Sequence, residues 1–265
     1  MPAPRPLTRS VVVDRLRAAG CVFAEDEAEL LLSAATTSTA LARMLDQRVA
    51  GRPLEHVLGW VEFFGLRWVV GRGVFVPRRR TELLVRQAAA LAAPGSVVLD
   101  LCCGSGAVGA ALATMVSGAQ VHASDVDPAA VRYARANLVA AGGRVYEGDL
   151  YDALPSALRG RVDILLANAP YVPTGSIAMM PPEARLHERT VALDGGADGL
   201  DVQRRVIAEA PQWLAPGGHL LVETSRRQAA GTAEAFSSNG LRPQVVRCDE
   251  LDATVVYGTS SVSRL

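Results

Sequence analysis

The sequence predicts an α/β protein with a doubly wound, mostly parallel sheet. From residue 81 onward, short apolar runs such as 96–102 alternate with helical patterns such as 107–116. This regular alternation is typical of parallel sheets that are covered by helices. The last two apolar runs, 242–248 and 254–258, have few residues between them. We therefore expect that final pair of strands to be antiparallel.

The region before residue 81 has a different pattern. Residues 8–50 show helical periodicity that Gly51 and Pro53 interrupt, and residues 61–77 are rich in aromatic and β-branched residues, which favours a hairpin. We expect three parts, which are an N-terminal helical domain at 1–58, a β-hairpin connector at 59–78 and an α/β domain at 79–265.

Composition excludes several classes of protein. The 265 residues are 49% hydrophobic, which suits one large globular domain or two small ones. Because 27 basic residues balance 27 acidic ones, no net charge attracts nucleic acid, and we expect no stable nucleic-acid partner. The first twenty residues contain only a three-residue aliphatic run, so we expect neither a signal peptide nor a membrane span there.

The cysteines do not form a metal-binding pattern. None of Cys21, Cys102, Cys103 and Cys248 belongs to a Cys-x-x-Cys pair, so we expect reduced thiols, no metal site and a cytoplasmic location.

A glycine turn follows the first strand of the α/β region. Residues 97–112 read VVLDLCCGSGAVGAAL, in which Asp100 ends the strand and Gly104 and Gly106 open a helix. Ligands of such sheets lie beyond the carboxyl ends of the strands, and glycine lets the backbone approach them closely. The run lacks the P-loop pattern and fits the dinucleotide pattern, although a single match of this kind is weak evidence.

Three successive strands end in aspartate, at Asp100, Asp125 and Asp149. S-adenosylmethionine is an elongated ligand with an ammonium, a ribose and an adenine, and it carries no phosphate. Asp100 is placed to hold its cation, Asp125 its ribose hydroxyls and Asp149 its adenine amino group. Strand ends are often polar, but three aspartates at the ends of successive strands favour this cofactor. The predicted cofactor site comprises Asp100, Cys102, Cys103, Gly104, Ser105, Gly106, Asp125, Val126, Asp149, Leu150 and Asn168.

The next apolar run ends abruptly in Asn168, Ala169, Pro170 and Tyr171. Taken alone, Asn168 could be a turn residue, Pro170 could end the strand, and Tyr171 could pack with its hydroxyl in water. At the end of a fourth strand, however, the same residues would lie beside the methyl group of the predicted cofactor.

From about residue 54 to 258, the chain resembles the protein-(glutamine-N5) methyltransferases, which methylate the glutamine of peptide-chain release factors. The matching segments are GRPLEHVLG, EFFGLRW, VFVPRRRTELLV, LDLCCGSGA, SDVDPAAV, GDLYDAL, NAPYVP, VALDGGADGLD and LAPGGHLLVET. The resemblance implies a Rossmann-like class I S-adenosylmethionine methyltransferase sheet and a protein substrate such as a release factor.

The resemblance also implies roles at the transfer site. In this family the Asn side-chain oxygen and the next backbone carbonyl accept the two amide protons of the glutamine, and Tyr stacks on the amide. The implied catalytic and substrate-binding residues are Asn168, Ala169, Pro170 and Tyr171. Ala169 stands where the family has proline, but it still offers a carbonyl, so we expect function to be retained.

Other positions depart from the family pattern. Arg79 and Arg80 stand where a proline and an acid are usual, and we predict that they contact the substrate, although such charged runs are more often solvated. Cys102 takes the first glycine position of the turn, and Arg189 replaces a proline. The helical region before Leu54 looks shorter than the family's N-terminal domain, which helps to grip the release factor.

The four histidines, His56, His122, His187 and His219, lie away from the transfer site in sequence. We read them as structural or surface residues, and His187 lies in a loop that is placed to cover the pocket.

Three alternatives stay open from the sequence. A methyltransferase of RNA or DNA amino groups would act on a flipped base; the balanced charge speaks against it, whereas the run PRRRTE favours it. A small-molecule N-methyltransferase is the second alternative. The third is a non-catalytic scaffold, which only the departure of Ala169 from the family's proline favours.

Overall fold

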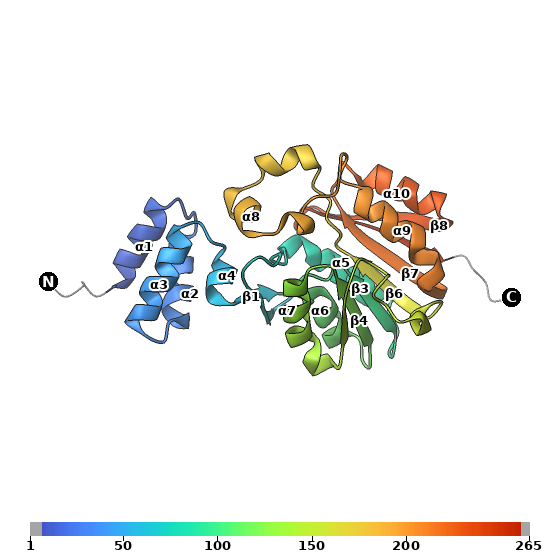
Figure 1. The fold of residues 1–265 in the computed structure, drawn as a ribbon, viewed down its shortest axis with the longest axis horizontal. Helices are drawn as coiled ribbons and strands as arrows, with labels where there is room; N and C mark the ends of the chain where they lie inside the picture. The colour runs from blue at the N-terminus through green and yellow to red at the C-terminus, as the bar shows by residue number, and fades with distance from the viewer. Residues whose placement is uncertain (1–6, 261–265) are drawn as a thin grey trace.

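The structure is a computed structural model that describes residues 7–260. Its N-terminal helices form a separate small core from Val12, Leu16, Leu31 and Leu45, together with their neighbours. Figure 1 shows this helical unit at one end of the molecule, away from the sheet. Its helices are α1 (Arg9–Ala18), α2 (Ala24–Ala34), α3 (Ser38–Val49) and α4 (Leu54–Leu58).

A short hairpin follows the helical unit. Strands β1 (Trp60–Phe63) and β2 (Leu66–Val69) pair antiparallel through a turn in which both Phe64 and Gly65 have positive φ, as a two-residue hairpin turn requires. The hairpin expected over 61–77 therefore ends at Val69. Beyond it the chain continues as a loop, because Gly71, Gly73 and Pro77 interrupt the strand pattern.

The large sheet has the order β5-β4-β3-β6-β7-β9-β8. The five strands from β5 to β7 are parallel, and β9 runs antiparallel to both β7 and β8, which confirms the expected antiparallel pair. The strands are β3 (Val97–Leu101), β4 (Gln120–Asp125), β5 (Arg144–Glu147), β6 (Val162–Ala167), β7 (Leu214–Thr224), β8 (Leu241–Cys248) and β9 (Ala253–Ser260).

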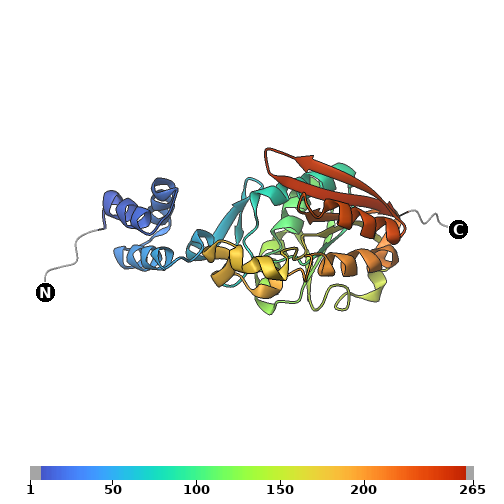
Figure 2. The ribbon, with the colours of Figure 1, turned by 90° about the horizontal axis from the view of Figure 1, so that it is seen from above.

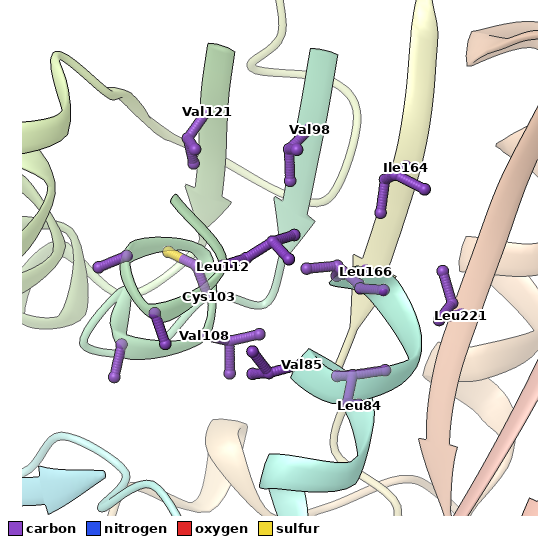
Figure 3. Close-up of a cluster of buried hydrophobic side chains, with 14 of the residues drawn as sticks. Leu84, Val85, Val98, Cys103, Val108, Leu112, Val121, Ile164, Leu166 and Leu221 are labelled. Atoms are coloured by element: carbon purple, nitrogen blue, oxygen red, sulfur yellow. The ribbon is translucent and has the colours of Figure 1, made fainter. Parts of the chain in front are cut away.

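Helices cover both faces of this sheet, as Figures 1 and 2 show. Alternate strand residues face opposite layers: Val98 and Leu166 pack against α5 and α6, whereas Leu99 and Leu165 pack with residues of α9 and α10. Figure 3 shows the first layer, in which apolar strand side chains meet those of α5 and α6. The helices are α5 (Glu82–Leu91), α6 (Ala107–Met115), α7 (Pro128–Leu138), α9 (Asp201–Trp213) and α10 (Ala229–Ser238).

A long excursion joins β6 to α9, and α8 (Pro182–His187) lies within it. In Figure 1 it runs between the helical unit and the sheet. Arg48 of α3 forms a half-buried ion pair with Glu27 and also contacts Glu183 of α8 at 3.3 Å, which links the helical unit to the excursion. The short 3₁₀ helices are Arg79–Thr81, Val139–Ala141, Ser156–Leu158, Thr174–Met179 and Thr190–Ala192. Within residues 7–260, none of the helices has the length and apolar character needed to cross a membrane.

We predict that Gly106→Ala destabilises the fold more than Gly95→Ala does. Both glycines have a left-handed backbone, but a Cβ on Gly106 would lie 2.9 Å from the Cα of Ala134 on α7, whereas Gly95 faces open space. The left-handed conformation costs roughly 1–2 kcal/mol in either variant, and overpacking adds about 1–3 kcal/mol at Gly106. Denaturant unfolding measures both, and equal losses would contradict the packing role.

Candidate active site

A cavity of about 380 Å³ opens at the carboxyl ends of β3, β4 and β6, where the strand order reverses around β3. Doubly wound sheets bind their ligands at such a switch point, and the volume suits a small-molecule ligand. The residues of the sequence-derived set that line it are Arg80, Asp100, Cys102, Cys103, Gly104, Ser105, Asp125, Val126, Asp149, Leu150, Asn168, Ala169, Pro170 and Tyr171.

Two residues of that set lie outside the lining. Arg79 is exposed, while its neighbour Arg80 faces the cavity, because consecutive residues of the 3₁₀ turn project about a third of a turn apart. Gly106 instead allows the close approach of α6 to α7.

Asp125 joins the glycine turn to the end of β4. Its Oδ2 accepts the Gly104 backbone N–H at 2.8 Å, and its Oδ1 accepts that of Asp127 at 2.8 Å. A carboxylate has about four lone-pair sites, so both oxygens can still accept hydrogen bonds from a ligand in the cavity. Neighbouring hydroxyl groups, such as those of a ribose, match this pair of acceptors.

Asp100 is the most deeply buried carboxyl group in the cavity wall. Its Oδ2 accepts the Gly109 N–H of α6 at 3.0 Å, and burial raises the pKa of Asp100 to about 7. A cation bound beside it would favour the ionised form and lower the pKa again. The site therefore suits a ligand with a positive charge at this end of the cavity.

Asp149 pairs with a residue that no sequence pattern indicated. Arg205 of α9 also lines the cavity, and its Nη2 donates to Asp149 Oδ2 at 2.7 Å. The two residues are 56 positions apart, and only the packing of α9 brings them together. The second carboxylate oxygen of Asp149 remains available to a ligand amino group.

The turn between these carboxylates has two unusual features. Cys102 takes a positive φ of 54°, which L-residues other than glycine seldom adopt. Ser105 Oγ is buried without a hydrogen-bond partner within residues 7–260, although such groups normally have one. Burial also raises the pKa of the Cys102 and Cys103 thiols, so both stay neutral.

Asn168 lies at the opposite wall of the cavity, directly after β6. Its Nδ2 donates to Thr81 Oγ1 at 3.3 Å, which leaves the side-chain oxygen free to accept from a ligand. Ala169 follows and is 1% exposed. The Tyr171 hydroxyl donates to Glu223 Oε1 at 3.2 Å. Thr81 lies within the arginine motif and Glu223 within LVET, but only their proximity in the fold indicates a role.

The glycine-rich segment 193–201 supports the backbone of this wall. A Cβ on Gly195 would lie 2.7 Å from the Pro170 carbonyl oxygen, and one on Gly199 would lie 2.3 Å from that of Tyr171. Gln228 also donates to the Tyr171 carbonyl at 2.9 Å. The ALDGGADGLD motif therefore serves close backbone packing behind the predicted transfer site.

The excursion closes a further side of the cavity. Val191, Ala192 and Leu193 line it, whereas His187 does not. The excursion is held nearby by Glu188, which accepts from Arg78 Nη2 at 2.5 Å and from the Val76 backbone N–H at 3.2 Å.

Arg189 adds a second tether to the excursion. Its Nη1 donates to Asp127 Oδ1 at 2.6 Å, beside the strand end that carries Asp125. The departure from the proline expected at this position therefore provides an ion pair at the edge of the cavity.

The histidines do not take part in this arrangement. His56 bonds the Val74 carbonyl oxygen, His122 the Tyr146 hydroxyl and His219 the Thr259 hydroxyl, and none of the four lines the cavity. Their structural interpretation agrees with these contacts.

Comparisons with known proteins agree with this geometry. Residues 72–181 match the methyltransferase small domain family. A release factor glutamine methyltransferase of Geobacter sulfurreducens is 39% identical over 74% of this chain and 69% of its own length. The chain belongs to the release factor glutamine methyltransferase family.

Two further proteins are similar to this chain, one in sequence and one in fold. A 4-amino-L-phenylalanine/4-methylamino-L-phenylalanine methyltransferase of Streptomyces pristinaespiralis is 37% identical over 73% of this chain and 68% of its own length. The crystal structure of a methyltransferase from Pyrococcus furiosus superimposes with a TM-score of 0.57 at 17% identity, covering 85% of this chain and all of that one. The predicted Rossmann-like class I methyltransferase fold is confirmed.

The enzyme is an S-adenosylmethionine-dependent methyltransferase, and its cavity fits that cofactor. The wall offers carboxylates for an ammonium and for hydroxyl groups, at Asp100 and Asp125, and the Ser105 hydroxyl, which has no hydrogen-bond partner in the described part of the chain. A cofactor without phosphate agrees with this acidic lining, because phosphate groups would be repelled there.

We predict that Asp125→Ala weakens cofactor binding by roughly 10- to 100-fold. Hydrogen bonds to a charged group contribute about 1.5–3 kcal/mol, and each 1.4 kcal/mol is about tenfold in affinity. Calorimetric titration measures the loss. Asp249→Ala, the same change at a surface ion pair with Arg226, is the control and should leave the affinity unchanged. Wild-type affinity in Asp125→Ala would refute the assignment.

We predict that cofactor affinity increases as pH rises through about 7, the pKa of Asp100. Below this pH the free enzyme holds Asp100 protonated and neutral, and above it the carboxylate attracts the cofactor's ammonium. One titrating group changes affinity by at most about tenfold per pH unit. Titrations across this range measure the slope, which should flatten in Asp100→Asn. A variant with the wild-type slope would show that another group titrates.

Proposed function

We propose that the enzyme methylates the side-chain amide nitrogen of a glutamine in a peptide-chain release factor. The observation that carries the proposal is the orientation of Asn168, whose Nδ2 is directed at Thr81 and whose Oδ1 is left to accept an amide proton. The name of the Geobacter sulfurreducens relative supports the choice of acceptor. A release factor acts in the cytoplasm, so the proposal places the enzyme there.

The chemistry follows from the properties of an amide. Its nitrogen is a poor nucleophile because its lone pair is delocalised into the carbonyl. Asn168 Oδ1 and the Ala169 carbonyl would each accept one N–H, which orients the nitrogen and draws electron density onto it. The Tyr171 ring, fixed by its hydroxyl at Glu223, would stack on the planar group.

When bound, S-adenosylmethionine supplies an electrophilic methyl group on a positively charged sulfur. Asn168 and Ala169 would hold the acceptor nitrogen facing that methyl group. After transfer the nitrogen is cationic and acidic, so one of its protons can leave to solvent. A histidine base is therefore unnecessary, in agreement with the four histidines lying outside the cavity lining.

We also propose a division of labour along the chain. The α/β domain at 79–265 would perform transfer, and the helical domain at 1–58 would grip the protein acceptor through the connector at 59–78. The contact of Arg48 with Glu183 supports this arrangement, because it joins the helical domain to the excursion that borders the cavity.

A small-molecule acceptor is the second candidate, and one observation favours it. The Streptomyces pristinaespiralis relative has a name that describes methylation of an arylamine, whose nitrogen lone pair is also delocalised into a planar group. Arg80 lines the cavity with a half-exposed side chain and could hold the carboxylate of an amino acid acceptor.

The deciding experiment supplies labelled S-adenosylmethionine with either a purified release factor or 4-amino-L-phenylalanine. The proposal expects label in the release factor and none in a factor whose target glutamine is replaced by glutamate. Label only in the amino acid would favour the second candidate. Cell extract with and without ribonuclease serves as a third arm, because label in RNA would contradict both.

We predict that Asn168→Ala lowers kcat by about 10²–10³-fold, the usual loss for one preorganised polar contact, while cofactor affinity stays near that of the wild type. Asn168→Asp tests the charge: its carboxylate keeps the shape but stabilises the sulfonium more before transfer than in the transition state. We expect equal or tighter cofactor binding and slower transfer. Calorimetry and single-turnover rates measure both, and a wild-type rate in Asn168→Asp would reduce Asn168 to a turn residue.

A further inference from the structure

The most deeply buried acid near the proposed acceptor site is Glu223, which does not itself line the cavity. Strand pairing puts it there. Ala167 of β6 lies opposite Val222 of β7, so Asn168, directly after β6, comes next to Glu223 of β7. Glu223 is 2% exposed, and its Oε2 has no hydrogen-bond partner within residues 7–260.

Three residues that line the cavity converge on this carboxylate. The Tyr171 hydroxyl donates to Oε1 at 3.2 Å, and Arg80 Nε lies 3.6 Å from the same oxygen. Thr81 also lies close enough to lower the pKa of Glu223, which burial raises. Thr81 is in turn the acceptor for Asn168 Nδ2.

The direction of these hydrogen bonds follows from the chemistry of each group. An ionised carboxylate can only accept, and a threonine hydroxyl has a single proton to donate. If Thr81 gives that proton to Glu223, its oxygen can only accept from Asn168. The amide of Asn168 must then present its NH₂ to Thr81 and its oxygen to the cavity. Glu223 thereby determines which end of the Asn168 amide meets the acceptor.

We propose that Glu223 is a positioning residue for methyl transfer, whose carboxylate fixes the Asn168 amide through Thr81 and the Tyr171 ring through its hydroxyl. The inference rests on the proposed function, in which Asn168 Oδ1 and Tyr171 hold the acceptor amide. It adds a residue that touches neither acceptor nor cofactor and acts through the two that do.

A purely structural role explains Glu223 less well. Taking a carboxylate out of water is costly unless close partners compensate, and the one cation paired with it within residues 7–260, Arg80, is half exposed and 3.6 Å away. An amide or an apolar side chain would fill this volume at lower cost. A carboxylate differs from an amide in having no N–H group that could donate to Thr81.

The test replaces Glu223 by glutamine, whose NH₂ can donate to Thr81 and so reverse the direction of the hydrogen bonds that run through Thr81. We expect kcat with the release factor to fall by about 10- to 100-fold, the usual loss for a residue that orients a ligand-binding group. Cofactor affinity and the melting temperature should remain near wild-type values. Glu250→Gln, the same change at an exposed position, is the matched control.

Thr81 provides an independent test that does not alter the buried charge. Thr81→Val keeps the shape and removes the hydroxyl, whereas Thr81→Ser keeps the hydroxyl. We expect Thr81→Val to lose kcat like Glu223→Gln and Thr81→Ser to retain most of it. Because both changes act through one path, the double variant should be little slower than the slower single variant.

The outcomes distinguish this inference from the proposed function on which it rests. Normal transfer by the wild type together with wild-type kcat in Glu223→Gln overturns the inference alone, as do equal rates in Thr81→Val and Thr81→Ser. If Glu223→Gln fails to fold, the two Thr81 variants decide. A wild-type enzyme that does not methylate the release factor overturns the proposed function and this inference with it.

Discussion

The pairing of β3 with β4 on one side and with β6 on the other is the constraint on which the site depends. Parallel pairing brings the carboxyl ends of all three strands to one edge of the sheet. Because the chain leaves β3 toward one side and returns at β6 on the other, the loops diverge and leave a cavity between them. Asp100, Asp125 and Asn168 come from separate segments, yet the ladder alone places them around one ligand-sized space.

The acids around this cavity are held by different means. Asp125 is bonded by backbone N–H groups of the turn, and Asp149 by Arg205. Burial raises the pKa of Asp100, Asp125 and Glu223, so the free enzyme bears an electrostatic cost there. A cationic cofactor relieves that cost at Asp100, which gives the cavity a preference for a positively charged ligand.

The structure shows what surrounds each residue that departs from the family pattern. Cys102 adopts the left-handed backbone that a glycine would take more easily, and Arg189 gains an ion pair with Asp127. Ala169 is buried in the cavity wall and keeps its carbonyl beside Asn168. None of these substitutions places a new charge beside the proposed acceptor amide, whereas Arg80 does place one at the cavity.

The sequence by itself determined the α/β alternation, the antiparallel final pair and the part of the cavity lining that comes from strand ends and the glycine turn, because strand ends, glycine turns and apolar periodicity are local patterns. It could not separate Arg80 from Arg79, since the direction of a side chain in a 3₁₀ turn depends on where that turn docks. It also predicted too long a hairpin, because the loop beyond Val69 is held by contacts with distant residues, such as that of Val76 with Glu188.

Only the tertiary structure decided which groups stand behind the site. Arg205 reaches Asp149 across 56 positions, and Thr81 meets Asn168 across 87. No local pattern marks such pairs, because their residues are ordinary members of helices and turns until the sheet brings them together. Glu223 is the clearest example: its motif is an unremarkable strand end, and its place beside Asn168 follows from the register of β6 against β7.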